Sequence, residues 1–347
     1  MRQFHVLAAA VGLLALAPAA HAADACAPEG KISYLCGPKN VEDMALMKGG
    51  RWIIASGMVG PGDTAGQLYL IDADKQAART LTPDLSGPAR APYAACPGAP
   101  DPARFAPHGV ALRPGARGRS TLYVVNHGGR ESIEVFDVDA SAGEPAVRWI
   151  GCVVLPEGVS GNAVAPLPGG GFVATKFETA NDPQAFQKME AGVKDGLLYE
   201  WSPKTGFKPV PGSGMSGANG VEASADGKWL FANAWPEKRV IRFRRGSSAQ
   251  PVAVKVDFLP DNIRMAPDGK LLVTGQASDM ATLLSCKTDR CPHAWTVIKL
   301  DPVTLKVTPV LQVDGTQAFS DATVGIQVGG RIWVGTYRGD RVAVASR

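Results

Sequence analysis

A pattern that recurs six times constrains the fold of this chain more than any other feature of its sequence. Each copy begins with a polar pair or turn and an apolar residue, passes through a turn that contains Gly or Pro, and ends in a dense β-run. The copies begin, 42 to 66 residues apart, at Glu42, His108, Asn162, Asn219, Asp261 and Ala322. Further short apolar runs lie between them, so each copy holds several antiparallel strands. A repeat of about 40–60 residues built from short strands is typical of a propeller blade, so the sequence predicts an all-β fold, a six-bladed β-propeller.

Composition agrees with this fold and excludes several others. The 40 Gly and 27 Pro among 347 residues disfavour a helical bundle, because both residue types interrupt helices. With 45% hydrophobic residues the chain has the material for a core, which excludes disorder and collagen. The net charge of +4 is small and no long basic run occurs, so nucleic acid is not an expected partner. One segment departs from the pattern: residues 181–193 contain helix formers and predict a short helix or loop over the third blade.

The first 22 residues have the features of a secretory signal peptide. Arg2 supplies the positive start, Val6 to Leu16 is apolar, and Ala20-His21-Ala22 is a small-x-small cleavage site. The apolar run is shorter than the roughly 20 residues that a membrane-spanning helix needs. We therefore expect residues 1–22 to be a signal peptide and residues 23–347 to form a single propeller domain. The mature protein is expected to be periplasmic or secreted, with no membrane span after signal cleavage.

The six cysteines are interpreted as disulfides, because an exported chain folds in an oxidising space. Six cysteines permit 15 pairings. Without excluding the others, proximity in the sequence favours Cys26 with Cys36, Cys286 with Cys291 and, as the remaining pair, Cys96 with Cys152. A zinc site is not expected, since the chain has no CxxC pair.

Oxygen-bearing side chains stand at the start of the innermost strand in several predicted blades. They are Glu42, Asn162, Asn219, Asp261 and Asn262. Because these starts converge on the central channel of a propeller, residues far apart in the sequence become neighbours there. Carboxylate and amide oxygens without thiols suit a hard cation, and Ca²⁺ takes six to eight oxygen ligands. The set predicts a central calcium site; the alternative is that Asn and Asp only initiate strands and satisfy turns.

Two histidines flank one predicted hairpin. His108 begins the inner strand of the second blade and His127 ends the β-run that follows, so the hairpin returns both rings to one face of the propeller. Imidazoles in contact can relay a proton, one as base and the other holding its tautomer; the alternative is two structural histidines. His293, beside Cys291-Pro292, is expected in a surface loop. No GxSxG elbow, phosphate loop or dinucleotide fingerprint occurs, so water attack on a metal-polarised carbonyl is favoured over a covalent serine mechanism.

Several segments resemble the paraoxonase/arylesterase family, within the gluconolactonase and senescence-marker-protein-like six-bladed propellers. Their order and spacing cover nearly all of the expected mature chain. The segments are Val41-Glu42-Asp43-Met44, Pro107-His108-Gly109-Val110, Leu122-Tyr123-Val124-Val125-Asn126-His127, Gly161-Asn162, Ala218-Asn219-Gly220-Val221, Asp261-Asn262-Ile263 and Asp321-Ala322-Thr323-Val324. The specific part is Pro-His-Gly followed by Val-Val-Asn-His, since strand-like runs occur in any propeller.

The resemblance implies roles for residues already singled out. It makes His108 and His127 a catalytic dyad, and it implies that a catalytic calcium is bound by Glu42, Asn162, Asn219, Asp261 and Asn262. The calcium would hold the carbonyl oxygen of a lactone or ester while His108 helps to deprotonate water.

The chain departs from the family pattern at three places. Members with a second, structural calcium pair an acidic residue equivalent to Asp43 with another directly after the catalytic Asn, where this chain has Ala163. The resemblance therefore leaves a second calcium open, with Asp43 as its candidate ligand. The family's histidine after the fifth inner β-run is replaced near Gln276. No C-terminal cysteine is present to join the first and last blades, so ring closure is expected to rest on strand pairing.

The sequence thus favours an exported, calcium-dependent hydrolase of small lactones or aryl esters. Loops at blade edges usually carry specificity. The substrate pocket is expected there, with a rim formed by Lys176, Phe177, Glu178, Trp235, Gln276 and Tyr337. The alternative is a propeller that does not hydrolyse, either a strictosidine-synthase-like lyase or a binding module that presents its loops to a partner.

Overall fold

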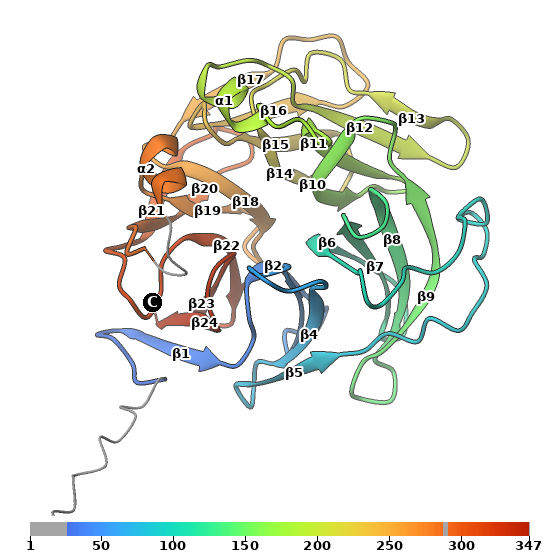
Figure 1. Ribbon diagram of the computed structural model, residues 1–347, viewed down its shortest axis with the longest axis horizontal. Coiled ribbons are helices and arrows are strands. Elements are labelled where there is room, and N and C mark those ends of the chain that lie inside the picture. Colours follow the sequence, from blue (N-terminus) through green and yellow to red (C-terminus); the bar gives the residue numbers. More distant parts are fainter. Residues whose placement is uncertain (1–25, 287–290, 347) are drawn as a thin grey trace, which may run out of the picture.

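Six antiparallel sheets, each of four strands, surround a common axis in the computed structural model of the protein, which describes residues 26–286 and 291–346 (Figure 1). This arrangement confirms the predicted all-β, six-bladed propeller. The predicted signal peptide, residues 1–22, lies outside the described residues. Within the described part of the chain, no helix is both long and apolar enough to cross a membrane.

The first three blades are four-stranded meanders that follow one another along the chain. The first holds β2 (Val41–Leu46), β3 (Trp52–Gly57), β4 (Gln67–Asp72) and β5 (Ala77–Leu81). The second holds β6 (Pro107–Pro114), β7 (Arg119–Asn126), β8 (Ser132–Asp139) and β9 (Ala146–Val154). The third holds β10 (Val159–Pro166), β11 (Phe172–Thr179), β12 (Leu197–Ser202) and β13 (Gly206–Pro209).

The fourth and fifth blades repeat this order, and the sixth combines both ends of the described chain. The fourth holds β14 (Ala218–Ala223), β15 (Trp229–Ala234), β16 (Arg239–Arg244) and β17 (Val252–Lys255). The fifth holds β18 (Leu259–Met265), β19 (Leu271–Gln276), β20 (Trp295–Leu300) and β21 (Val307–Val313). The sixth holds β22 (Ala322–Val328), β23 (Arg331–Thr336), β24 (Arg341–Ser346) and β1 (Ile32–Cys36).

Strand β1 closes the ring. It pairs antiparallel with β24, from Ile32 opposite Ala345 to Cys36 opposite Arg341. The first β-strand of the described chain therefore supplies the outermost strand of the last blade, and the expectation that closure rests on strand pairing is confirmed. The two ends of the domain hold each other in place because every hydrogen bond of this pair joins distant parts of the chain.

The hydrophobic core lies between the blades. Six clusters of buried apolar side chains each combine residues of two neighbouring blades, so the clusters run once around the ring. The first and second blades, for example, share Ile54 and Leu70 with Leu122 and Phe136. Strand faces that pack on both sides explain why the β-runs of the sequence are nearly continuous in apolar residues.

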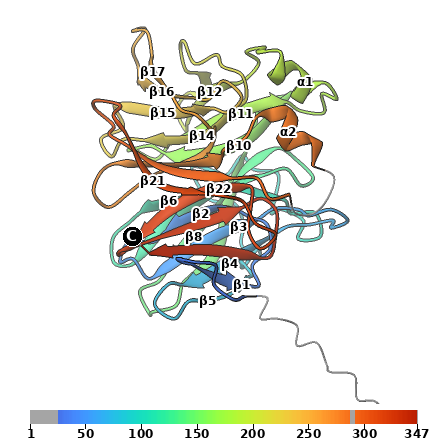
Figure 2. The same cartoon turned by 90° about the vertical axis from the view of Figure 1, so that its left-hand side faces the viewer.

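The disulfides and helices complete the framework. The three bonds join Cys26 to Cys36, Cys96 to Cys152 and Cys286 to Cys291, which confirms the pairing favoured by sequence proximity. Helix α1 (Ala185–Glu190) lies within the segment expected to be a helix or loop. Helix α2 (Met280–Ser285) was not expected, because six residues are too few for a periodic signal; its start is capped by Asp279. Both helices lie on the same face of the ring (Figure 2).

Each innermost strand has a break in its pairing register directly after it starts. The unpaired positions are Glu42 in β2, His108 and Gly109 in β6, Asn162 and Ala163 in β10, Asn219 and Gly220 in β14, Asp261 and Asn262 in β18, and Thr323 in β22. Such β-bulges bend a strand and turn its side chains in a new direction. All five predicted ligands of the central calcium thus lie in bulges near the starts of the inner strands.

The bulges also require glycine where neighbouring inner strands approach. A Cβ atom on Gly220 would lie 2.5 Å from the backbone oxygen of Asp261 and 2.8 Å from Cα of Asn262. We expect Gly220→Ala to lower the free energy of unfolding by about 1–3 kcal/mol, the usual cost of overpacking, measured by urea unfolding. The control is Gly330→Ala, since a Cβ at that exposed turn meets nothing within 4 Å. Equal stability of the two variants would contradict the close approach.

Candidate functional site

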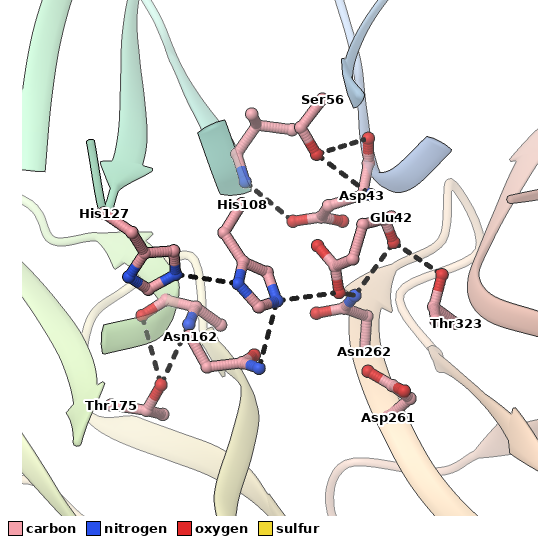
Figure 3. Close-up of polar contacts among 12 residues, drawn as sticks. Glu42, Asp43, Ser56, His108, His127, Asn162, Thr175, Asp261, Asn262 and Thr323 are labelled. Atoms are coloured by element: carbon pink, nitrogen blue, oxygen red, sulfur yellow. Dashed lines mark hydrogen bonds and ion pairs between the residues drawn. The ribbon is translucent and has the colours of Figure 1, made fainter. Parts of the chain in front are cut away.

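The six bulges bring polar side chains from different blades to one end of the central axis. Figure 3 shows Glu42 of β2, His108 of β6, Asn162 of β10 and both Asp261 and Asn262 of β18 around a common point. The five predicted ligand residues are all nearly inaccessible to solvent, with exposed fractions of 2% for Glu42, 4% for Asn162, 4% for Asn219, 6% for Asp261 and 1% for Asn262. A buried cluster of this composition must satisfy its charges and oxygens locally.

Hydrogen bonds in this cluster occupy the amide nitrogens of Asn162 and Asn262, while several buried oxygens have no hydrogen-bond partner. Asn262 donates Nδ2–H to Glu42 Oε1 at 2.7 Å, and Asn162 Nδ2 lies 3.2 Å from His108 Nε2. Four buried oxygens have no hydrogen-bond partner among the described residues: Glu42 Oε2, Asn162 Oδ1, Asn219 Oδ1 and Asn262 Oδ1. A buried acceptor left unpaired costs about 1–3 kcal/mol. Four such atoms, from four blades, fit a cation that prefers oxygen ligands.

The carboxylates of the cluster support the same conclusion. The pKa of Asp261 is raised well above its ordinary value, first by burial and then by the charge of Glu42. For His108, burial opposes the charged ring, but the Glu42 carboxylate, with Oε1 3.5 Å from Nε2, reverses this and raises the pKa. A cation among these groups would remove the repulsion between the two buried carboxylates.

Gln276 and Trp235 lie behind Asp261 rather than on an exposed rim. Gln276 donates Nε2–H to Asp261 Oδ2 at 2.9 Å and to the backbone oxygen of Ala322 at 2.8 Å, and it accepts from Trp235 Nε1 at 3.1 Å. Gln276 is fully buried and Trp235 is 5% exposed. The structure thus places both residues where they hold the orientation of Asp261.

Three other predicted rim residues, Lys176, Phe177 and Glu178, lie in strand β11 and not in a loop. The strand continues this far because β10 pairs with its end, Ser160 opposite Glu178. Lys176 forms an ion pair with Asp195 at 2.7 Å. Glu178 Oε2 is buried without a hydrogen-bond partner among the described residues, and its pKa is raised first by burial and then by Glu131.

His293 is not the surface-loop residue that the sequence indicated. Its Nδ1 lies 2.7 Å from Oδ1 of Asp321, which is fully buried, and the histidine side chain is only 13% exposed. Asp321 directly precedes the inner strand of the sixth blade, so the contact was hidden by a separation of 28 residues. Tyr337, the last predicted rim residue, is near both Asp321 and Asp261; burial first, and then these carboxylates, raise its pKa.

The two predicted dyad histidines are in contact. His108 Nδ1 lies 2.9 Å from His127 Nε2, with the rings at 71° to each other (Figure 3). Beyond them, Glu131 places both carboxylate oxygens on His127 Nδ1, at 2.8 and 2.9 Å. Sequence reasoning missed Glu131; its spacing of four residues from His127, across a turn that contains Gly128-Gly129, was the available signal.

Asp43, the candidate ligand of a second calcium, already has a cationic partner. Its carboxylate pairs with Arg264 and also accepts from the backbone N–H of Val110 and Met44. The same guanidinium donates to backbone oxygens, among them that of Val110 at 3.0 Å. Burial raises the pKa of Asp43 to about 7, although Arg264 opposes that rise. Because Arg264 takes the place in which a cation would neutralise Asp43, a second calcium does not fit these residues.

Two other features of the described residues do not belong to this cluster. A cavity of about 500 Å³ opens at the opposite ends of the inner strands, lined by residues such as Met44, Leu112 and Arg264, and it contains no histidine and none of the predicted ligands. Cys96 and Cys152 lie close to Glu134 in a geometry that suits a metal. Both sulfurs are joined in a disulfide, so this group is structural.

Comparison with known proteins gives a family and a fold. A family model described as Arylesterase matches residues 38–341. A luciferin-regenerating enzyme has a similar structure, with 14% identity, a TM-score of 0.56, and coverage of 91% of this chain and 95% of that chain. A putative gluconolactonase gives 15% identity, a TM-score of 0.53, and coverage of 92% and 93%. At this identity both structures show the fold alone. No curated protein matches the chain.

The pair of Asp43 and Arg264 makes a testable contribution to stability. Arg264→Met leaves the Asp43 carboxylate buried without its cation, and breaking a buried pair in this way costs about 3–5 kcal/mol. We expect that loss in urea unfolding. The double variant Asp43→Asn/Arg264→Met buries no charge and should recover a large part of it. If the single variant is as stable as the parent chain, Arg264 does not neutralise Asp43.

Proposed function

The chain belongs to the arylesterase family, as its sequence resemblance indicated, and from this premise we propose that it is a calcium-dependent hydrolase of lactones or aryl esters. Family membership supports a hydrolase that acts on small molecules. The observation that carries the calcium part is the set of four buried, unpaired oxygens contributed by four bulges. If these residues served only to start strands, we would expect their buried oxygens to have hydrogen-bond partners.

The residues that would hold the ion are Glu42, Asn162, Asn219, Asp261 and Asn262. Their donor set contains oxygens, as calcium requires, and the amide nitrogens of Asn162 and Asn262 are occupied by His108 and Glu42, which leaves the amide oxygens of these two residues for the ion. When bound, calcium polarises the substrate carbonyl and stabilises the negative charge that develops on its oxygen.

His108 and His127 handle the proton in this proposal. A water oxygen bonds to the carbonyl carbon while His108 Nε2 takes a proton from the water. The carbon–oxygen bond to the alcohol part then breaks, and the proton passes to the leaving oxygen, so that an ester gives an acid and an alcohol and a lactone gives a hydroxy acid. His127 supports the ring of His108 through the contact at 2.9 Å.

Buried apolar side chains support the cluster from behind. Trp235 packs with Met189 of α1 and with Met280 and Leu283 of α2, and it reaches the ligand set through Gln276. Phe177 is the partly exposed member of this group, and its ring suits contact with the apolar part of an ester or lactone.

Export forms part of the same proposal. Three disulfides join all six cysteines, and such bonds persist in oxidising compartments. Together with the signal features of residues 1–22, they favour a periplasmic or secreted protein made of residues 23–347.

Hydrolysis and its metal dependence test the proposal. On a panel of lactones and aryl esters, we expect a chelator to abolish turnover and added Ca²⁺ to restore it. Asp261→Asn should lower kcat/KM by about 100-fold or more, the scale on which loss of transition-state charge stabilisation acts. The matched control is Asp314→Asn, since this carboxylate is exposed, directly follows β21, the outermost strand of the fifth blade, and should leave turnover unchanged.

Two outcomes would contradict the proposal. Full turnover by the chelated protein, with no bound metal detected, would exclude the calcium-dependent mechanism. A folded, calcium-loaded chain that turns over none of the panel would favour the non-hydrolytic alternatives, a lyase or a binding module.

A further inference from the structure

Glu131 lies at the outer end of the contact between the two histidines and is fixed at two points. Its Oε1 and Oε2 lie 2.8 and 2.9 Å from His127 Nδ1. Oε2 also accepts from the backbone N–H of Gly161 at 3.2 Å, the residue directly before the proposed ligand Asn162. The carboxylate is thus anchored both to a histidine and to strand β10.

We propose that Glu131 is a positioning residue that determines which nitrogen carries the proton in both histidines, and thereby leaves the lone pair of His108 at Nε2, facing the ligand cluster. This inference rests on the proposed hydrolase function for its kinetic consequence, but the protonation pattern itself is a property of the folded chain.

The pattern follows from the donors and acceptors along the row formed by Glu131, His127 and His108. An ionised carboxylate only accepts hydrogen bonds, so His127 Nδ1, which faces both oxygens of Glu131, must carry a hydrogen. In a neutral imidazole the other nitrogen is then the acceptor. His127 Nε2 therefore accepts, and His108 Nδ1, at 2.9 Å, must donate to it. The remaining nitrogen of a neutral His108, Nε2, carries no hydrogen and keeps its lone pair.

Two groups lie near His108 Nε2. Glu42 Oε1, at 3.5 Å, already accepts from Asn262 Nδ2 at 2.7 Å. The nearer group is the amide nitrogen of Asn162, at 3.2 Å, a donor that agrees with the assignment. That orientation turns Asn162 Oδ1 away from the ring, and Oδ1 is one of the four unpaired oxygens. A single chain of donors and acceptors thus connects Glu131 to both the base and a proposed ligand atom.

The row also leads from the interior toward solvent. Side-chain exposure is 15% for His108, 27% for His127 and 25% for Glu131. When Nε2 of His108 takes a proton, its Nδ1 proton can move to His127 Nε2, and the positive charge on His127 is then next to Glu131. No proton leaves or enters the row in this shift, so the charge is stabilised at the end that water reaches.

Glu131→Met is the variant that releases the pattern. Both carboxylate oxygens lie 2.8 and 2.9 Å from His127 Nδ1, so a Gln amide would still offer that nitrogen an oxygen, whereas Met has a similar length and removes both oxygens. His127 Nδ1 then need not carry the hydrogen, and His108 can carry its own at Nε2, which faces Glu42 Oε1 at 3.5 Å. Glu131→Asp keeps an acceptor-only group and should preserve the original pattern, while Glu157→Gln, at an exposed position, is the matched control.

The first measurement is ¹⁵N NMR of the histidine rings in the full chain, with His108→Gln and His127→Gln to assign the signals. We expect hydrogen on Nδ1 of both rings in the parent chain, in Glu131→Asp and in Glu157→Gln, and hydrogen on Nε2 of His108 in Glu131→Met. Hydrogen on His108 Nε2 in the parent chain, or the same pattern in the parent chain and Glu131→Met, would overturn the inference.

The second measurement is hydrolysis by the same variants. Glu131→Met should lower kcat by about 100-fold or more, the range of general acid–base catalysis, with KM within about threefold of the parent value. Glu131→Asp should retain much more of the rate. A loss that appears only in KM, or an equal loss in both Glu131 variants, would overturn the inference. If the parent chain hydrolyses nothing, the proposed function fails, and the NMR result still decides the role of Glu131.

Discussion

The polar cluster at the centre of this protein depends on one backbone constraint, the bulge near the start of each inner strand. A regular β-ladder would point successive side chains up and down the blade faces, into the clusters that hold neighbouring blades together. The register breaks between Val41 and Asp43, and at the matching place in the other five blades, free one or two residues per strand from that alternation. These residues form the polar cluster, so the apolar packing between blades and the polar centre are built from the same strands without competing for positions.

The buried carboxylates around the axis fall into two groups that differ in their partners. Asp43 is neutralised by Arg264, a cation supplied by the chain itself. Glu42 and Asp261 have no arginine or lysine partner among the described residues, and the oxygens around them are unpaired. The cluster therefore carries an energetic cost that a bound cation would remove, and binding of that cation stabilises the folded state by mass action. The proposed catalytic ion and the stability of the ring are linked for this reason.

The sequence predicted the architecture more completely than it predicted the side-chain contacts. Six repeats and the cysteine pairing were accessible because both are encoded by spacing along the chain, and closure by strand pairing followed from the missing C-terminal cysteine. Arg264 and its partner Asp43 are 221 residues apart and meet only when the ring closes, so no local pattern shows the pair. Glu131 was missed since a glycine turn, not a periodic element, returns it to His127. The rim residues Gln276 and Trp235 were placed near the cluster but on the wrong side of it, because sequence does not distinguish a side chain that lines a pocket from one that supports its wall.

Calorimetric titration of the folded, metal-free chain with Ca²⁺ tests the central claim most directly, that bulge residues gather their oxygens into one cation site. We expect one calcium per chain, a higher unfolding temperature when it is bound, and a large loss of affinity in Asn219→Ala. Absence of binding, or the same affinity in Asn219→Ala, would contradict the claim, and a second tight site would contradict the assignment of Arg264 as the cation of Asp43.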